Sequence, residues 1–66
     1  MNKRKFYNIV CKDMPLSGGC SADDEASAAR IFCNKHFADW YPPYLTGDQW
    51  CVQNSTTIVR FKITEK

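Results

Sequence analysis

The sequence lacks the features by which many enzymes and membrane proteins are recognised. No stretch approaches the roughly 20 consecutive apolar residues that a transmembrane helix needs. No Cys-x-x-Cys pair of the zinc-module type occurs, and the pair Gly18-Gly19 is too short to indicate a phosphate-binding loop. Repeats and low-complexity tracts are also absent. The sequence therefore predicts a small globular domain without a cofactor.

Size and composition agree with this interpretation. The chain has 66 residues, of which 44% are hydrophobic and 24% charged, so we expect one folded domain over residues 1–66. The net charge of +2 is too small to indicate a nucleic-acid binder by itself. A basic start precedes a short apolar run, Phe6 to Cys11, but this run contains Asn8 and lacks a small-residue cleavage site. We therefore expect a cytoplasmic protein.

Four cysteines and a single histidine are the candidate chemical groups. Without a signal peptide, we expect reduced thiols that pack as small hydrophobic groups. Cys33 and His36 lie three residues apart on one predicted helix face, and Cys11 and Cys20 could complete a zinc site with them. We favour the alternative, with Cys33 in the core and His36 partly buried and hydrogen-bonded. A nucleophilic Cys33–His36 pair would need an open cleft, so we expect no catalysis.

The hydrophobic pattern predicts three strands and one helix. Residues 5–12 alternate as a strand, "DMPLSGGC" (13–20) reads as a loop, and a helix follows from Ala22 to about Trp40 or Tyr41. Ser21 would cap this helix, and the two prolines at 42–43 would end it. Strands at 49–53 and 56–64 then form a hairpin around Asn54-Ser55. We expect an α+β fold of order β-α-β-β: a three-stranded antiparallel-type sheet whose first strand pairs with the last, and one helix on one face.

A helical wheel assigns the faces of the predicted helix. The apolar stripe is centred on Ala22, Ala29, Cys33, His36 and Trp40, with Ala26, Phe32 and Phe37 on its flanks. Ile31 faces away from this stripe, which makes it a candidate contact residue together with Lys35.

The face of the sheet without the helix is a second candidate surface. The residues expected there are Phe6, Asn8, Val10, Lys12, Gln49, Cys51, Gln53, Ile58, Arg60 and Lys62. Such a face could be solvated, covered by a partner protein, or used for a homodimer contact. Alternatively, Phe6, Lys12, Arg60 and Lys62 could bind nucleic acid by stacking and phosphate contacts.

The segment "WYPPYLTGDQW" (40–50) is the third candidate. Trp40 and Trp50 are expected to close the core, while Tyr41, Tyr44 and Asp48 remain exposed as partner contacts, because aromatic residues are favoured anchors in interfaces. The Tyr41–Pro42 bond is a candidate for the cis form.

With a strand, the helix "EASAARIF" and a hairpin in one small cytosolic domain, the chain resembles the small single-domain proteins that bacteriophages and mobile elements use against host machinery, the anti-CRISPR type among them. The resemblance implies a non-enzymatic protein in the host cytoplasm, monomeric or homodimeric. It would bind a larger host protein or nucleoprotein assembly and inhibit or adapt it. A nucleic-acid-binding module and a zinc-stabilised domain remain the alternatives.

Overall fold

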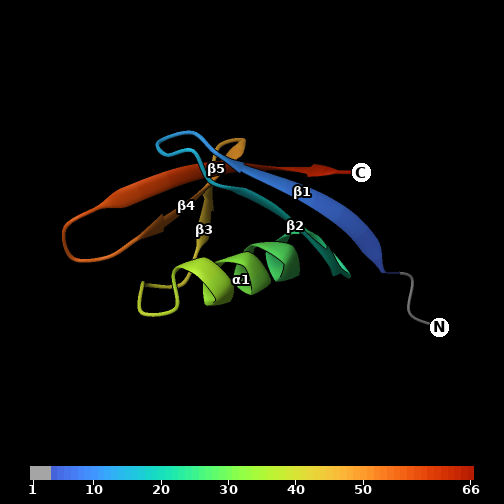
Figure 1. Ribbon diagram of the computed structural model, residues 1–66, viewed down its shortest axis with the longest axis horizontal. Helices are drawn as coiled ribbons and strands as arrows, with labels where there is room; N and C mark the ends of the chain where they lie inside the picture. Colours follow the sequence, from blue (N-terminus) through green and yellow to red (C-terminus); the bar gives the residue numbers. More distant parts are fainter. Residues whose placement is uncertain (1–3) are drawn as a thin grey trace.

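The computed structural model describes residues 4–66, so Met1, Asn2 and Lys3 of the predicted domain lie outside the described residues. Its elements in chain order are β1 (Lys5–Cys11), β2 (Ser17–Ala22), α1 (Glu25–His36), β3 (Tyr44–Thr46), β4 (Gln49–Gln53) and β5 (Ile58–Glu65). The strands form one antiparallel sheet in the order β2-β1-β5-β4-β3. Figure 1 shows α1 on one side of this sheet only.

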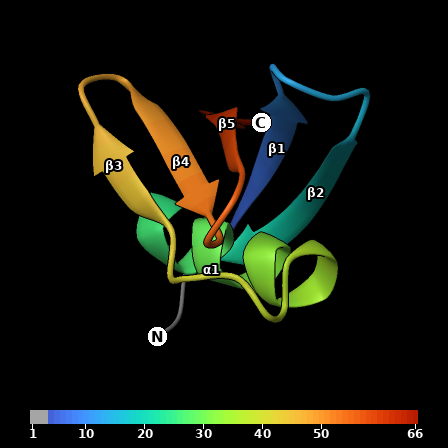
Figure 2. The same cartoon turned by 90° about the vertical axis from the view of Figure 1, so that its left-hand side faces the viewer.

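The α+β class and two of the predicted pairings are confirmed. β1 pairs with β5, and β4 pairs with β5 as a hairpin. The prediction of three strands is wrong, because two further strands occupy the edges of the sheet. Viewed end-on, β3 and β4 rise on one side and β1 and β2 on the other, with α1 beneath them (Figure 2).

The edge strands lie in segments that were predicted as loops. β2 begins at Ser17 inside the predicted loop 13–20 and continues through the expected helix cap Ser21 to Ala22. It pairs with β1 over its whole length. β3 follows the two prolines and pairs with β4. Glycines suit β2 because its neighbours come close. A Cβ atom at Gly18 would lie 3.3 Å from Cε1 of Phe32, and one at Gly19 would lie 3.2 Å from the carbonyl oxygen of Tyr7.

The helix is shorter at both ends than predicted. Asp24, and not Ser21, is the N-cap, and its carboxylate accepts the backbone N–H of Ser27 at 2.8 Å. The helix ends at His36, where the N–H of Phe37 donates to the carbonyl of Cys33 at 2.7 Å. Ala22 and Trp40, both assigned to the helical stripe, therefore lie outside the helix.

The core lies between α1 and the sheet. Alternate residues of β1 and β5 point into it, and the helix contributes Ala28, Ala29, Phe32 and Cys33. Phe61 on the central strand is fully buried, and its ring lies 5.6 Å from that of Phe32. Two members of the predicted helical stripe, Ala26 and His36, are exposed instead. Because α1 covers one face, the opposite face of the sheet is available as a site.

Candidate binding surfaces

The uncovered side of the sheet, here called the outer face, is defined by the strand register. Residues paired across neighbouring strands share a face, so Tyr44, Cys51 and Arg60 lie side by side, as do Val10 and Lys62. Its further members are Phe6, Asn8, Ser17, Gly19 and Ser21 on β1 and β2, and Thr46, Gln49, Gln53, Ile58 and Thr64 on the other strands. Of the residues that the sequence assigned to this face, all except Lys12 lie on it by this alternation, and Lys12 follows the end of β1.

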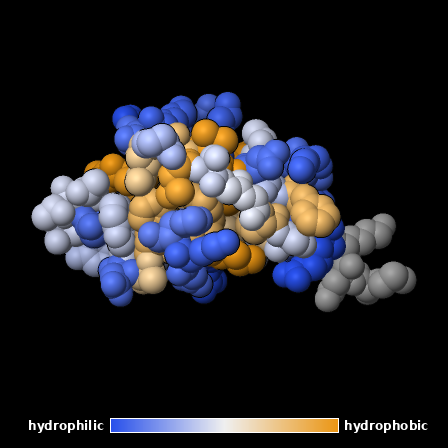
Figure 3. Space-filling view, viewed as in Figure 1, coloured by the Kyte–Doolittle hydropathy of each residue, from blue (hydrophilic) through white to orange (hydrophobic). Residues whose placement is uncertain are grey.

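Large apolar side chains are exposed across the outer face. Phe6 is 64% exposed, Val10 and Ile58 are each 55% exposed, and Tyr44 is 42% exposed. A solvated sheet face normally carries polar side chains at these positions. Figure 3 shows apolar and hydrophilic patches side by side on the face of the molecule seen in Figure 1. The outer face therefore combines apolar contact area with polar groups.

An ion pair fixes the arginine at the middle of this face. The Arg60 guanidinium donates to both carboxylate oxygens of Asp13, at 3.0 Å from Nη2 and 3.3 Å from Nε. The backbone N–H of Arg60 also donates to Asp13, at 2.9 Å. These bonds hold the pKa of the Asp13 carboxyl below its usual value, and the carboxylate in turn raises the pKa of Arg60. Arg60 is thus oriented, and its charge is largely balanced.

A hollow of about 400 Å³ lies beside this ion pair. The side chains that line it are Asp13, Tyr44, Thr46, Gln49, Cys51, Ile58 and Arg60. Cys51 is only 4% exposed although it belongs to the outer face. The hydroxyl of Tyr44 donates to Oε1 of Gln53 at 2.8 Å, whereas Oε1 of Gln49 is buried without a hydrogen-bond partner. The hollow therefore combines an aromatic ring, an aliphatic side chain and an oriented ion pair.

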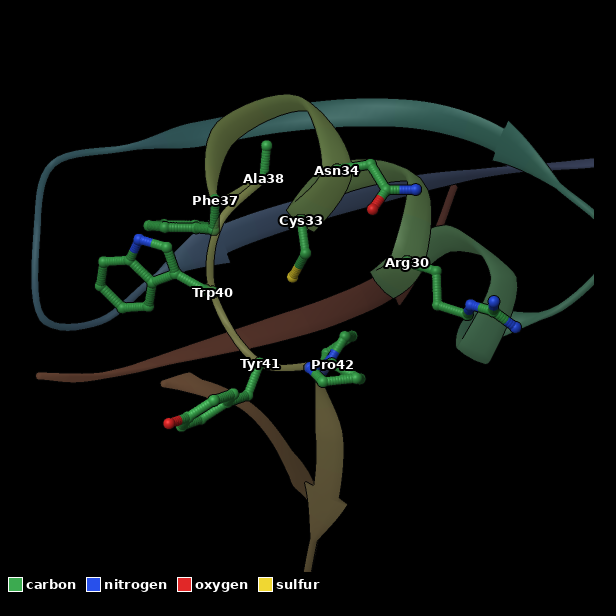
Figure 4. Close-up of a pocket in the computed structure, with 9 residues that line it drawn as sticks. Arg30, Cys33, Asn34, Phe37, Ala38, Trp40, Tyr41 and Pro42 are labelled. Carbon is green, nitrogen blue, oxygen red and sulfur yellow. The ribbon is translucent and has the colours of Figure 1, made fainter. Parts of the chain in front are cut away.

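A second, smaller cleft of about 150 Å³ lies between α1 and the segment that leads to β3. Arg30, Cys33 and Asn34 line it from the helix, and Trp40, Tyr41 and both prolines line it from the segment. In Figure 4 the Cys33 sulfur points into the space between the helix and Tyr41 and Pro42. Burial raises the pKa of the Cys33 thiol to about 11. This thiol is therefore protonated at neutral pH and is a weak nucleophile.

The five predicted partner-binding residues do not form one surface. Ile31 is 41% exposed and lies on the helix with exposed Lys35, whereas Tyr44 belongs to the outer face on the other side of the sheet. Asp48 is exposed in the turn between β3 and β4. Tyr41, 56% exposed, lines the smaller cleft, and its N–H donates to the carbonyl of Gln53 at 2.8 Å. The peptide bond between Tyr41 and Pro42 is trans, so the cis form is not adopted.

The four residues predicted to bind nucleic acid lie on the outer face or beside it. Phe6, Arg60 and Lys62 share the outer face, and Lys12 follows β1 beside Arg60, where its N–H donates to the Arg60 carbonyl at 2.8 Å. Three of these four residues are basic, and one of the three is engaged by Asp13.

The side chains proposed for a zinc site are not arranged as a metal-binding group. All four cysteines are free thiols, and no group of three or more His, Cys, Asp or Glu residues within positions 4–66 is arranged to hold a metal ion. Cys33 is buried, whereas His36 is exposed and lies over the Phe32 ring, with 4.7 Å between the centroids. Trp50 is buried at the core edge as predicted, and Trp40 is partly buried.

Three members of the hollow cannot be assigned to it from the sequence. Asp13 lies in a segment predicted as a loop, and Tyr44 and Thr46 lie on β3, a strand in a second segment predicted as a loop. The available signal was the alternation of Tyr44 and Thr46 about Leu45, which is typical of a short strand.

No helix in the described part is both long and apolar enough to cross a membrane. Protein-family models, curated proteins and solved structures contain no match to this sequence.

Proposed function

We propose that this chain is a small non-enzymatic protein that binds a larger host protein or nucleoprotein assembly and inhibits or adapts it. The observation that carries the proposal is the outer face, where Phe6, Val10, Tyr44 and Ile58 are exposed on a sheet side that no described element covers. Apolar and aromatic side chains of this kind form the centre of protein interfaces, with polar groups at the rim. The proposal includes anti-defence inhibitors of the phage type.

The hollow supports the same proposal because its walls carry residue types that anchor protein interfaces. Its walls combine the Tyr44 ring and Ile58 with Arg60, whose orientation Asp13 already fixes. Tyrosine and arginine are over-represented among the residues that dominate binding energy. A preorganised arginine also loses less conformational entropy when a partner binds.

The charge distribution favours a protein partner over nucleic acid. Asp13 balances Arg60, and Glu65 lies 3.8 Å from Lys5, so fewer basic groups remain for phosphates. The two aromatic residues of the outer face are also far apart. Phe6 lies level with Lys66 on the chain beside it, and Tyr44 lies level with Arg60, a separation of six residues or about 20 Å along β5. Neighbouring bases could not stack on both rings.

The test compares two substitutions on opposite faces of the sheet. Ile58 and Leu45 are both strand residues and both 55% exposed, but Leu45 pairs with inward-facing Trp50. The wild type, Ile58→Ser and Leu45→Ser would each be used to capture partners from a bacterial lysate, with identification by mass spectrometry. We expect the wild type and Leu45→Ser to retain the same partner. Ile58→Ser should bind this partner with an affinity at least about fivefold lower.

Circular dichroism spectra of both variants would establish that each remains folded. Loss of the partner from Leu45→Ser alone, or equal binding by all three proteins, would contradict the use of the outer face. Binding to oligonucleotides that weakens steeply with salt would favour the nucleic-acid alternative instead.

A further inference from the structure

No residue within positions 4–66 pairs with the outer side of the edge strand β2. It has six residues, Ser-Gly-Gly-Cys-Ser-Ala, and it lies at the end of the strand order. Its register with β1 is continuous from Lys5–Ala22 to Val10–Ser17, so no bulge interrupts it. Natural edge strands are usually protected by lysine, proline or a bulge. β2 has none of these.

The hydrogen-bond pattern identifies which backbone groups of β2 are free. The N–H of Lys12 donates to the carbonyl of Arg60, and the N–H of Lys66 donates to the carbonyl of Phe6, so even-numbered residues of β1 bond to β5. Odd-numbered residues of β1 therefore bond to β2, which agrees with the 2.9 Å bond from Cys11 N–H to the Leu16 carbonyl. Their partners are Gly18, Cys20 and Ala22. The N–H and C=O groups of the alternate residues 17, 19 and 21 consequently point away from the sheet.

The helix runs beside this edge in the direction opposite to β2. The Cys20 thiol lies 3.6 Å from the Ala28 carbonyl, and Gly18 lies against the Phe32 ring and near His36. Residue 19 is therefore level with about residue 31 of the helix. Figure 1 shows α1 running beneath β2.

Helical periodicity then defines the flank of α1 that faces the β2 edge. At 100° per residue, Asp24, Ile31 and Lys35 lie on the same side as Ala28, which contacts β2. Arg30 and Asn34 lie on the other flank, where they line the cleft against Tyr41. The exposed Ile31 is thus beside the open strand.

We propose that a second copy of this chain pairs with it along this edge, β2 against β2 in antiparallel orientation about Gly19, to form a symmetric dimer. The residues 17, 19 and 21 of one copy would bond to residues 21, 19 and 17 of the other. The five strands of each copy would then form one continuous sheet. The two helices would run antiparallel on the same side of it.

Charge complementarity selects a second copy as the occupant. The helix flank carries acidic Asp24 at its start, Ile31 in the middle and Lys35 in its last turn. An antiparallel arrangement about residue 19 places each acidic start beside the basic end of the other helix and brings the two Ile31 side chains close to the symmetry axis. The antiparallel helix dipoles are also favourable.

The other edge of the sheet is less suited to pairing. β3 has only three residues, half the length of β2. In the proposed dimer both outer faces lie on the same side of the continuous sheet, because the symmetry axis is perpendicular to it. Self-association therefore leaves the proposed partner surface free and doubles it.

The proposed contact is limited to the six-residue strand β2 and one flank of α1, so the test covers high concentrations. Stable interfaces bury about 800 Å² on each partner. Sedimentation velocity from about 10 µM to about 1 mM would follow the monomer–dimer equilibrium. We expect dimer to accumulate over this range. A chain that stays monomeric at the highest concentration would overturn the proposal.

Amide hydrogen exchange by NMR locates the interface. We expect the amides of Ser17, Gly19 and Ser21 to exchange slowly at high concentration and fast on dilution. The amides of Gly18 and Cys20, which bond to β1, should be protected at both concentrations. Protection that appears instead at Tyr44 to Thr46 would assign the dimer to the β3 edge of the sheet and overturn the proposal.

Two matched substitutions test the role of the helix flank. Ile31→Asp places like charges near the symmetry axis and should weaken dimerisation at least tenfold, whereas Ile58→Asp, on the outer face, should leave it unchanged. Lys35→Glu is a milder variant for the case in which Ile31→Asp unfolds, and it should also weaken the dimer. Equal dimerisation by wild type and folded Ile31→Asp, or by wild type and Lys35→Glu, would overturn the arrangement.

Discussion

Substituting the same residue type on the two faces of the sheet tests which face is the core. Phe61 is fully buried on the central strand, and its ring lies 5.6 Å from Phe32, whereas Phe6 on the outer face is 64% exposed. Phe61→Leu loses the aromatic pair, worth about 0.5–1.5 kcal/mol, and leaves a shape mismatch that costs less than about 1.5 kcal/mol. We therefore expect a loss of about 2 kcal/mol in the free energy of unfolding.

This loss is large for a chain of this size. At about 0.05–0.15 kcal/mol per residue, the 66 residues have a total stability of about 3–10 kcal/mol. A loss of about 2 kcal/mol lowers the melting temperature by about 8–16 °C. Phe6→Leu should change the stability by less than about 0.5 kcal/mol, because its side chain is mostly solvated in both states.

Urea unfolding followed by circular dichroism measures both variants under identical conditions. A Phe6→Leu variant as destabilised as Phe61→Leu would contradict this prediction, since the outer face would then be covered in the folded chain. A neutral Phe61→Leu would equally show that the core does not lie between α1 and the sheet.

Three further predictions concern single side chains. Asp24→Ala should lower the melting temperature and Ser21→Ala should not, because Asp24 caps the helix; the reverse order would exclude this cap. Bonds with Arg60 hold the pKa of Asp13 in the folded state below the ordinary value of 3.8. The pairing therefore stabilises the fold at pH values above 3.8, and this contribution is lost as the pH falls through the folded-state pKa. Asp13→Asn should reduce this acid dependence in melting curves recorded at several pH values, and an unchanged profile would contradict the prediction. Because burial raises the pKa of Cys33 to about 11, iodoacetamide at neutral pH should modify it only on unfolding, and rapid modification seen by mass spectrometry would contradict its burial.

The central strands were predictable because they alternate strongly. Ile9, Phe61 and Ile63 are β-branched or aromatic residues at alternate positions, and their strands pair as expected. The edge strands were not predictable from composition. β2 is made of serine, glycine, cysteine and alanine, which are typical of loops, and it is a strand because β1 offers it a ladder of hydrogen bonds.

The missed strands also explain the errors at the candidate sites. Because β2 continues through Ser21 and Ala22, the helix begins later and its cap moves to Asp24. Because β3 begins at Tyr44, this tyrosine moves from an exposed loop to the outer face. Ile31 was predicted to face away from the core and does so. What the sequence could not show is the open strand edge beside it.

The most direct test of the outer face as a binding surface is methyl NMR of the isotopically labelled chain, titrated with its captured partner. The proposal predicts that the methyl signals of Val10 and Ile58 shift or broaden as the partner is added. The signals of Leu45 and of Ile31 should remain in place at constant chain concentration. Shifts confined to Leu45 or Ile31, with Val10 and Ile58 unchanged, would contradict the proposal.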